Sequence, residues 1–306
     1  MAKIYPHAYF GNGIVPIESA NLSIASSAVL YGLSVYTVFP VCVGPDKKLR
    51  AFRLHDHWTR LINSAKIIGI DTFARDWTEE KFQKAVQESI AASEVIEDVF
   101  VRVTVHVSDL VPGVRSRGLS TTLSIFIYEA SCILPATGAR LKTSVWRRVP
   151  DYAIPSRAKV NGAYVNSVLA RQDALDSGYD DCLFLDVSGH VCELSAANVF
   201  VVRNGVLHTP SHSSDILEGI SRRTILAIAR DMDIQVSERT IDLTELYVAD
   251  EVFACGTSAF LTPVIEIDKR SIGNGEIGPI TKQLKEIYFD VLHGKNPKYQ
   301  DFLTEY

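Results

Sequence analysis

A lysine before a predicted helix is the first residue of this sequence that could do chemistry. Lys159 lies in the segment Ile-Pro-Ser-Arg-Ala-Lys-Val-Asn-Gly, between Pro155 and Gly162, so its amine is expected to project from a shaped loop. Burial frees the lone pair of a lysine for imine formation with a carbonyl compound. Most loop lysines are solvated surface charges, so position alone leaves both interpretations open.

A second candidate is the helix entry between Asp215 and Arg223. It places Gly219 and Ser221 before an apolar helix face. Free N–H groups and the positive end of the helix dipole favour a phosphate at such a start, where a glycine permits close approach and a hydroxyl can donate. An ordinary serine N-cap is the alternative.

Other chemical motifs are not supported. The match of Gly273–Gly278 to G-x-G-x-x-G is followed by Pro279 and lacks an acidic residue about 20 positions later, which favours a glycine-rich loop over a dinucleotide site. His55 and His57 are splayed by about 200° on a helix, so no metal pair is expected. The sequence has no G-x-S-x-G or H-E-x-x-H, and we predict no metal site.

Composition favours a cytoplasmic protein that acts on small molecules. The chain has 306 residues, 47% of them hydrophobic, and a net charge of -5, which gives no electrostatic basis for binding nucleic acid. No apolar run approaches the ~18 residues of a membrane span, and no export signal is evident at the N-terminus. Its odd set of five cysteines contains no C-x-x-C pair, which fits a reducing compartment.

Periodicity predicts strands and helices in both halves of the chain. Between Val99 and Val107 valines alternate with Phe100, Arg102, Thr104 and His106, so one strand carries a chemically unusual face. The other elements expected in the first half are a hairpin turn at Asn12-Gly13, a strand at 35–43, helices at 53–68 and 78–93, and a strand around 123–127.

The second half is expected to be mixed and the boundary to lie near Pro135 and Gly138. We predict helices at 164–177 and 221–232, strands at 182–187 and 198–202, hairpin turns at 188–189 and 204–205, a capping box from Asp242 to Glu245, and a last helix ending near Gly294.

Five motifs in order resemble the class IV, or branched-chain, aminotransferase family of pyridoxal-phosphate (PLP) enzymes. They are Arg157-Ala-Lys-Val-Asn-Gly-Ala-Tyr164, Cys192-Glu-Leu-Ser-Ala-Ala-Asn-Val-Phe200, Leu217-Glu-Gly-Ile-Ser-Arg222, Ala249-Asp-Glu-Val-Phe253 and Gly256-Thr-Ser-Ala259. The resemblance implies fold type IV: an α+β chain with a smaller N-terminal α/β sandwich at 1–132, a linker at 133–140 and a C-terminal pseudo-barrel with helices at 141–306. It also implies a homodimer or a higher homo-oligomer.

By this resemblance Lys159 holds PLP as a Schiff base and moves the proton between the substrate and cofactor carbons. Glu193 matches the acidic partner of the pyridine nitrogen, which keeps the ring protonated as an electron sink. Tyr164 matches the residue that hydrogen-bonds the ring hydroxyl. The remaining cofactor residues implied are Arg60, Gly219, Ile220, Ser221, Gly256 and Thr257, which surround the phosphate.

The substrate strand departs from the family pattern. Where branched-chain enzymes read approximately V-F-E-G-I-R, this chain reads Val35-Tyr-Thr-Val-Phe-Pro40. Thr37 replaces a carboxylate and Val38 replaces a glycine, and each change alters pocket volume and polarity. The Tyr-x-Val pattern looks more like the D-amino-acid and (R)-amine transaminase branches.

Arg102 points back to the branched-chain enzymes, whose arginine it matches, while Phe100 stands where a tyrosine often occurs. An arginine on that face is costly to bury without an anion, which favours a substrate carboxylate; a structural salt bridge is the alternative. The substrate residues we predict are Tyr31, Tyr36, Val38, Phe100, Arg102, Thr257 and Ser258.

The first hypothesis is therefore an aminotransferase that moves the amino group of a branched-chain or other hydrophobic amino acid to a 2-oxo acid by ping-pong chemistry. An (R)-amine or D-amino-acid transaminase is the second. A PLP lyase similar to aminodeoxychorismate lyase is the third, and a non-catalytic PLP-binding protein is disfavoured because Lys159, Glu193 and Tyr164 are all present.

Overall fold

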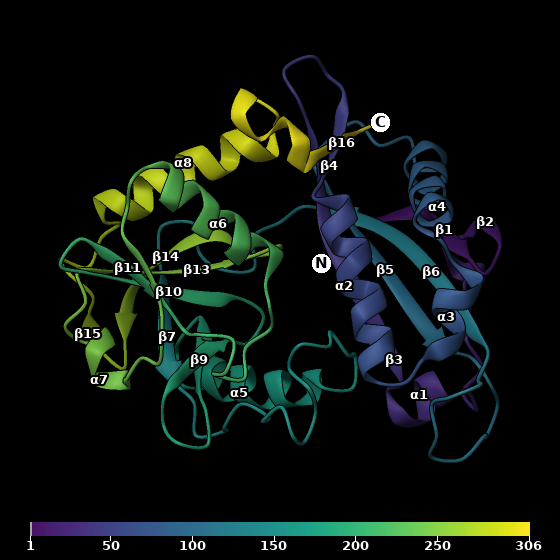
Figure 1. Cartoon of the computed structure of the whole chain (residues 1–306), viewed down its shortest axis with the longest axis horizontal. Helices are drawn as coiled ribbons and strands as arrows, with labels where there is room; N and C mark the ends of the chain where they lie inside the picture. The colour runs from purple at the N-terminus through teal and green to yellow at the C-terminus, as the bar shows by residue number, and fades with distance from the viewer. Residues whose placement is uncertain (1) are drawn as a thin grey trace. The chain divides into compact units, whose positions relative to one another are not determined.

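The computed structural model describes residues 2–306, which divide into two compact units (Figure 1). The first unit comprises the chain up to Ser131 together with Ala158–Ala163 and Val291–Tyr306. The second comprises Cys132–Arg157 and Tyr164–Asp290. This division differs from the expected domains at 1–132 and 141–306, because two later segments return to the first unit; the 133–140 linker stays a prediction.

A seven-stranded sheet forms the first unit, in the order β16-β4-β3-β5-β6-β1-β2. All its pairs are antiparallel, and β3 and β5 are paired along most of their length. Its strands are β1 (Ile4–Phe10), β2 (Gly13–Pro16), β3 (Ser34–Val43), β4 (Leu49–Phe52), β5 (Val99–Val107), β6 (Thr121–Glu129) and β16 (Leu303–Glu305).

Helices cover one face of this sheet, as the alternation in β5 requires. The valines of β5 lie in one apolar core with Trp58, Phe73 and Phe82 of the helices. Thr78 accepts a hydrogen bond from the Lys81 N–H and so caps α4 at the predicted start of this helix. The helices are η1 (Ile17–Ser19), α1 (Ser27–Tyr31), α2 (Leu54–Ile67), α3 (Asp71–Asp76), α4 (Glu79–Ala92) and η2 (Pro297–Phe302).

The second unit is a barrel with helices. Its strands pair in the order β10-β13-β14-β7-β8-β9, and a further pairing of β9 with β10 at Glu193 and Asn198 closes this path of six strands. Its strands are β7 (Ala139–Thr143), β8 (Asp181–Leu185), β9 (Val191–Leu194), β10 (Asn198–Arg203), β11 (Val206–Thr209), β12 (Val236–Glu238), β13 (Glu251–Gly256), β14 (Phe260–Ile267) and β15 (Arg270–Ser271). The predicted pseudo-barrel is confirmed.

A buried glutamate starts the last helix of the second unit. Glu251 accepts hydrogen bonds from the Ile280 and Thr281 N–H groups at 3.0 and 2.7 Å and from the Thr281 hydroxyl at 2.6 Å. These contacts satisfy orphan donors of the first turn. The helices of this unit are α5 (Tyr164–Asp176), α6 (Ile220–Asp231), α7 (Leu243–Leu246) and α8 (Pro279–Leu292).

Two local predictions are wrong. The first hairpin turns at Gly11-Asn12, because Phe10 pairs with Gly13 and the positive φ falls on Gly11. The Asp242 side chain makes no capping hydrogen bond, and Glu245 is drawn instead into an ion pair with Arg239. None of the helices in residues 2–306 has the length and apolar composition needed to cross a bilayer.

Candidate active site

Lys159 lies on a short segment that runs along β3 in the first unit. Its carbonyl accepts a hydrogen bond from the Tyr36 N–H at 3.0 Å, and its own N–H donates to the Ser64 hydroxyl at 3.0 Å. Val160 forms a bridge with Val35. The backbone of the lysine is therefore held by the sheet and by α2.

A close approach of two glycines fixes the end of this segment. The Gly162 N–H donates to the Gly32 carbonyl at 3.2 Å, and a Cβ on Gly32 would lie 2.8 Å from the Gly162 Cα. Gly32 also has a φ of +64°, which other residues rarely adopt. Both positions demand the smallest residue, and the Gly162 of the lysine motif has a structural reason.

The Tyr36 ring contacts both the lysine amine and the guanidinium of Arg102. The Lys159 Nζ lies 4.8 Å from the centre of the Tyr36 ring. The Arg102 guanidinium lies 3.8 Å from the same ring centre. Arg102 also donates to the Asn161 Oδ1 at 2.9 Å. Within residues 2–306 no carboxylate pairs with Arg102, so the structural salt bridge is not formed.

The strand face around Arg102 gathers further predicted substrate residues. Val38 stands opposite Arg102 in the β3–β5 register, and Phe100 follows opposite Pro40. Val38 and Phe100 are buried. Tyr31 ends α1 with 45% of its surface exposed, and its carbonyl oxygen would lie 3.6 Å from a Cβ on Gly162. The face therefore combines one cation with apolar and aromatic side chains.

Desolvation on this face also acts on a histidine. His106 contacts the Ser34 hydroxyl at 3.4 Å and the Ser124 hydroxyl at 2.8 Å. Burial, reinforced by the charge of Arg102, lowers the pKa of His106 from 6.5 to about 4. His106 is therefore neutral near pH 7, and Arg102 supplies the positive charge of this face.

Arg60 is oriented by a buried pair that the sequence did not predict. The Thr37 hydroxyl lies 2.6 Å from the His57 Nδ1 and accepts a hydrogen bond from the Arg60 guanidinium at 3.1 Å. Thr37 and His57 are both almost fully buried. The threonine that replaces the family's carboxylate thus connects β3 with two residues of α2.

Both carboxylate oxygens of Glu193 have partners within the second unit. Its Oε1 pairs with the Arg148 Nη2 at 3.0 Å, and its Oε2 accepts from the Asn198 amide at 2.9 Å and the Leu217 N–H at 3.1 Å. Only 6% of the residue is exposed. A buried carboxylate with a cation and two donors is stable in its ionised form.

The start of α6 suits an anion. Its N-cap is Gly219, no side chain caps the first turn, and Ile220 and Ser221 are its first residues. The Ser221 hydroxyl accepts from the Tyr288 hydroxyl at 3.0 Å, so its own proton can be donated elsewhere. The serine N-cap alternative is wrong, because Ser221 lies inside the first turn.

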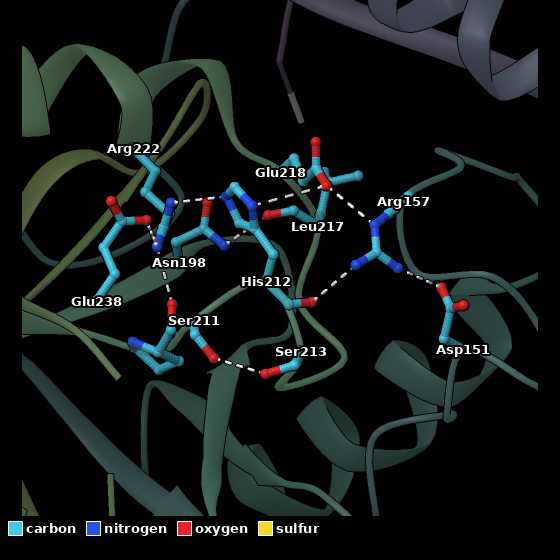
Figure 2. A network of polar contacts seen from close by, with 11 residues as sticks. Asp151, Arg157, Asn198, Ser211, His212, Ser213, Leu217, Glu218, Arg222 and Glu238 are labelled. Atoms are coloured by element: carbon cyan, nitrogen blue, oxygen red, sulfur yellow. Dashed lines mark hydrogen bonds and ion pairs between the residues drawn. The ribbon is translucent and has the colours of Figure 1, made fainter. Parts of the chain in front are cut away.

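A polar network holds the loop that precedes α6 (Figure 2). Arg222 is buried and donates to the Pro210 carbonyl at 2.8 Å, while it pairs with Glu238 at 2.8 Å and contacts His212 at 3.2 Å. On the other side of the loop Glu218 pairs with Arg157 at 3.0 Å. The path of the chain into the anion site is therefore fixed from two sides.

The other cofactor residues predicted in this unit lie at ends of elements. Tyr164 begins α5, and Gly256 ends β13. A Cβ on Gly256 would lie 3.1 Å from the Ala196 carbonyl, next to the turn that joins β9 to β10. Thr257 and Ser258 follow in the turn to β14.

Comparison with known proteins decides the family. The model of the family described as amino-transferase class IV matches residues 35–267. The chain belongs to the class IV aminotransferase family. A probable branched-chain-amino-acid aminotransferase of Aquifex aeolicus is 39% identical over 300 residues, which cover 97% of this chain and 96% of that protein.

Solved structures of the class IV family agree with the fold. A branched-chain aminotransferase from Thermoproteus uzoniensis, solved with norvaline, has a TM-score of 0.93 at 36% identity over 98% of this chain and 99% of that one. A branched-chain enzyme from T.th., complexed with N-(5'-phosphopyridoxyl)-L-glutamate, has a TM-score of 0.90 at 34% identity over 98% of each chain. Fold type IV is confirmed, and the family uses PLP.

The donor set of this chain fits that cofactor. An uncapped helix start and a guanidinium suit a phosphate, an amine suits an aldehyde, and a buried ionised carboxylate suits a pyridinium. Sequence reasoning missed the partners of these groups: Arg148, Asn198, Thr37 and His57. Asn198 stood in a quoted motif, whereas nothing in the sequence pairs Arg148 with Glu193.

Among residues 2–306, one group of three potential metal ligands lies outside this set. Atoms of Cys42, Asp98 and His293 lie within 4.8 Å of one another. His293 is already hydrogen-bonded to Asp98 at 2.8 Å, and the backbone N–H of Val43 donates to the same carboxylate at 2.8 Å. This pair ties the residues after α8 to the first sheet, and the absence of a metal stays a prediction.

Proposed function

We propose that the chain is a PLP-dependent aminotransferase that moves the amino group of a branched-chain or other hydrophobic amino acid to a 2-oxo acid. The observation that carries the proposal is the face on which the Lys159 amine and the Arg102 guanidinium both lie against the Tyr36 ring. It offers an amine for covalent attachment and a cation for a substrate carboxylate, among apolar side chains.

The residues would act on the cofactor at separate atoms. When bound, PLP supplies an aldehyde that exchanges amino groups and a ring that withdraws electrons from the substrate carbon. The Lys159 Nζ would hold the cofactor and would also take up and deliver a proton. Glu193 accepts a hydrogen bond from the ring nitrogen, and Tyr164 donates one to the ring hydroxyl.

Phosphate binding is assigned to the start of α6 and to further residues that the family resemblance names. The N–H groups of Ile220 and Ser221 and the Ser221 hydroxyl suit phosphate oxygens, as does the positive end of the α6 dipole. Arg60 supplies a guanidinium that Thr37 orients. Thr257 adds a hydroxyl, and Gly256 lets the backbone approach closely.

Substrate selection is assigned to the first sheet. Arg102 would bind a carboxylate, while Tyr36, Val38 and Phe100 exclude water and contact an apolar side chain. Branched-chain activity is also the printed name of relatives that align over nearly the whole chain, including the Escherichia coli K12 enzyme at 32% identity and 94% coverage.

One observation favours a second candidate, an (R)-amine or D-amino-acid transaminase. Val38 replaces a glycine and faces Arg102 across β3 and β5, so a buried isopropyl group reduces the space beside the cation. A narrowed carboxylate pocket favours amines that lack a carboxylate. It also favours substrates that bind with the carboxylate and the side chain in exchanged positions.

A half-reaction separates the two candidates. L-leucine and (R)-1-phenylethylamine are added separately to the PLP-loaded protein, and loss of the yellow absorbance band is followed. Bleaching by L-leucine alone supports the first candidate, and faster bleaching by the amine supports the second. Turnover that continues without any 2-oxo acid would contradict both and indicate a lyase, because a lyase regenerates its cofactor without an acceptor.

We also propose a cytoplasmic homodimer. All five cysteines are free thiols, which fits a reducing compartment. In the second unit α5 exposes 64% of Val165 and 64% of Val168, an apolar stripe that a monomer would leave in water. The double substitution Val165→Glu with Val168→Glu should give a monomer by light scattering, whereas Val187→Glu, at an exposed turn, should not.

A further inference from the structure

The second unit closes its barrel at the residue that is assigned to the cofactor ring. Glu193 of β9 is the direct antiparallel partner of Asn198 of β10, and this pair is the contact that joins the two strands. The Asn198 Nδ2 donates to the Glu193 Oε2 at 2.9 Å. The position of the carboxylate is thus set by the register of the closing strands.

Asn198 also connects the carboxylate to the loop before α6. Its Nδ2 donates to the Leu217 carbonyl at 3.0 Å, and the Leu217 N–H returns a hydrogen bond to the Glu193 Oε2 at 3.1 Å (Figure 2 shows Asn198 beside Leu217). A Cβ on Gly219 would lie 2.0 Å from the Asn198 Oδ1. The asparagine therefore occupies the space that a side chain at the N-cap of α6 would need.

Arg148 holds the other oxygen. Its Nη2 lies 3.0 Å from the Glu193 Oε1, its Nε donates to the Asp215 carbonyl at 3.3 Å, and its guanidinium lies 5.8 Å from the centre of the Phe184 ring. The Arg148 side chain is 13% exposed. Its fork is thus fixed by three partners of the second unit.

These contacts have a chemical consequence. A buried carboxylate that lost its cation would tend to take up a proton, and a protonated, neutral Glu193 would no longer present a negative charge to a pyridinium. Arg148 supplies the charge that prevents this. Asn198 and Leu217 each donate a hydrogen bond to the Oε2 of Glu193 and so fix the orientation of the carboxylate.

We propose that Arg148 and Asn198 are positioning residues that keep Glu193 ionised and aimed at the ring nitrogen of the cofactor. The inference rests on the proposed role of Glu193. It adds that recognition of the ring nitrogen depends on two residues that need not touch the cofactor. One of them, Asn198, also packs against the start of α6.

The test compares PLP with its 1-deaza analogue, in which carbon replaces the ring nitrogen. Dissociation constants of both are measured by fluorescence on full-length apoprotein. The ratio of the dissociation constant of the analogue to that of PLP isolates the contribution of the ring nitrogen to binding. The ratio should fall about tenfold in Arg148→Met and in Asn198→Ser, because each weakens one charge-assisted hydrogen bond. Arg148→Lys should restore part of the ratio, since it returns the charge without the fork.

The neighbouring Arg147 provides a matched control. It is exposed and its guanidinium donates to the Ser144 carbonyl at 3.1 Å, away from Glu193, so Arg147→Met should leave the ratio unchanged. A double substitution supplies the second arm. If Arg148 acts through Glu193, adding Arg148→Met to Glu193→Gln should lower the ratio no further.

The outcomes are separable. A ratio that stays constant while both dissociation constants rise together would make Arg148 and Asn198 merely structural and overturn the inference, as would a ratio that rises. An unchanged ratio in Glu193→Gln would instead overturn the assignment of Glu193 itself. A fall in Glu193→Gln, Arg148→Met and Asn198→Ser, with no further fall in the double variant, supports both.

Discussion

Lys159 in the first unit is held through its backbone, whereas Glu193 in the second unit is held through its carboxylate. The segment of Lys159 pairs with β3 and leaves the amine against an aromatic ring. Glu193 has three partners on its two oxygens. In the proposed function, the side chain that changes its bonds during the reaction is fixed at its base, and the one that stays constant is fixed at its tip.

The largest effect is expected from replacing Lys159, the side chain that is held through its backbone. Lys159→Ala removes the attachment and proton-transfer group and should lower the transamination rate by about 10³-fold or more. Circular dichroism should show an intact fold, because the backbone contacts of the segment remain. Lys66→Ala, at an exposed position of α2, is the control; equal activity in the two variants would remove Lys159 from the mechanism.

A glycine substitution breaks the backbone half without touching the amine. Gly32→Ala places a Cβ 2.8 Å from the Gly162 Cα at a φ of +64° and should lower the free energy of unfolding by about 3 kcal/mol. Urea unfolding measures the loss. Gly13→Ala, where a Cβ meets no atom within 4 Å, should change it by less than about 1 kcal/mol; similar losses in both would refute the close approach.

The burial of His106 beside the predicted substrate residues can be tested through the pH dependence of stability. The native pKa of His106 is about 4, below its ordinary 6.5, so the unfolded chain binds more protons between these values. Stability that is present above pH 6.5 is therefore lost as the pH falls through this window, by about 2 kcal/mol after allowance for partial exposure. His106→Gln should flatten the profile in urea unfolding, and His55→Gln, an exposed histidine, should not.

The smallest effect sharpens the comparison within the first unit, where Arg60 is held at its tip like Glu193. Thr37→Val removes the hydroxyl that accepts from Arg60 at 3.1 Å and should weaken PLP binding about fivefold. Fluorescence titration measures it. Thr59→Val on the exposed face of α2 is the control, and equal affinities would show that Thr37 does not orient the guanidinium.

Local patterns predicted the elements well because their causes are local. The alternation at 99–107 and the apolar stripe at 54–67 follow from one buried face each, and β5 and α2 confirm them. The capping box at Asp242 was wrong because Arg239 competes for Glu245. Such competition depends on residues that meet only in the folded chain.

Long-range pairings were beyond the sequence. Nothing local indicates that β9 and β10 close a barrel, that 158–163 runs along β3, or that β16 completes the first sheet. Motifs predicted Lys159 and Glu193, but their partners come from other elements. Family resemblance thus named the candidate groups, and only the structure shows what holds them.

The pairing of β16 with β4 has a consequence for biosynthesis. The sheet of the first unit draws on residues from Ile4 to Glu305, so its edge strand leaves the ribosome about 300 residues after its first strand. At about 5–20 residues per second this delay is on the order of 15–60 s. During that time the nascent sheet exposes the edge of β4, and a chaperone that shields this edge would raise the yield of the finished enzyme.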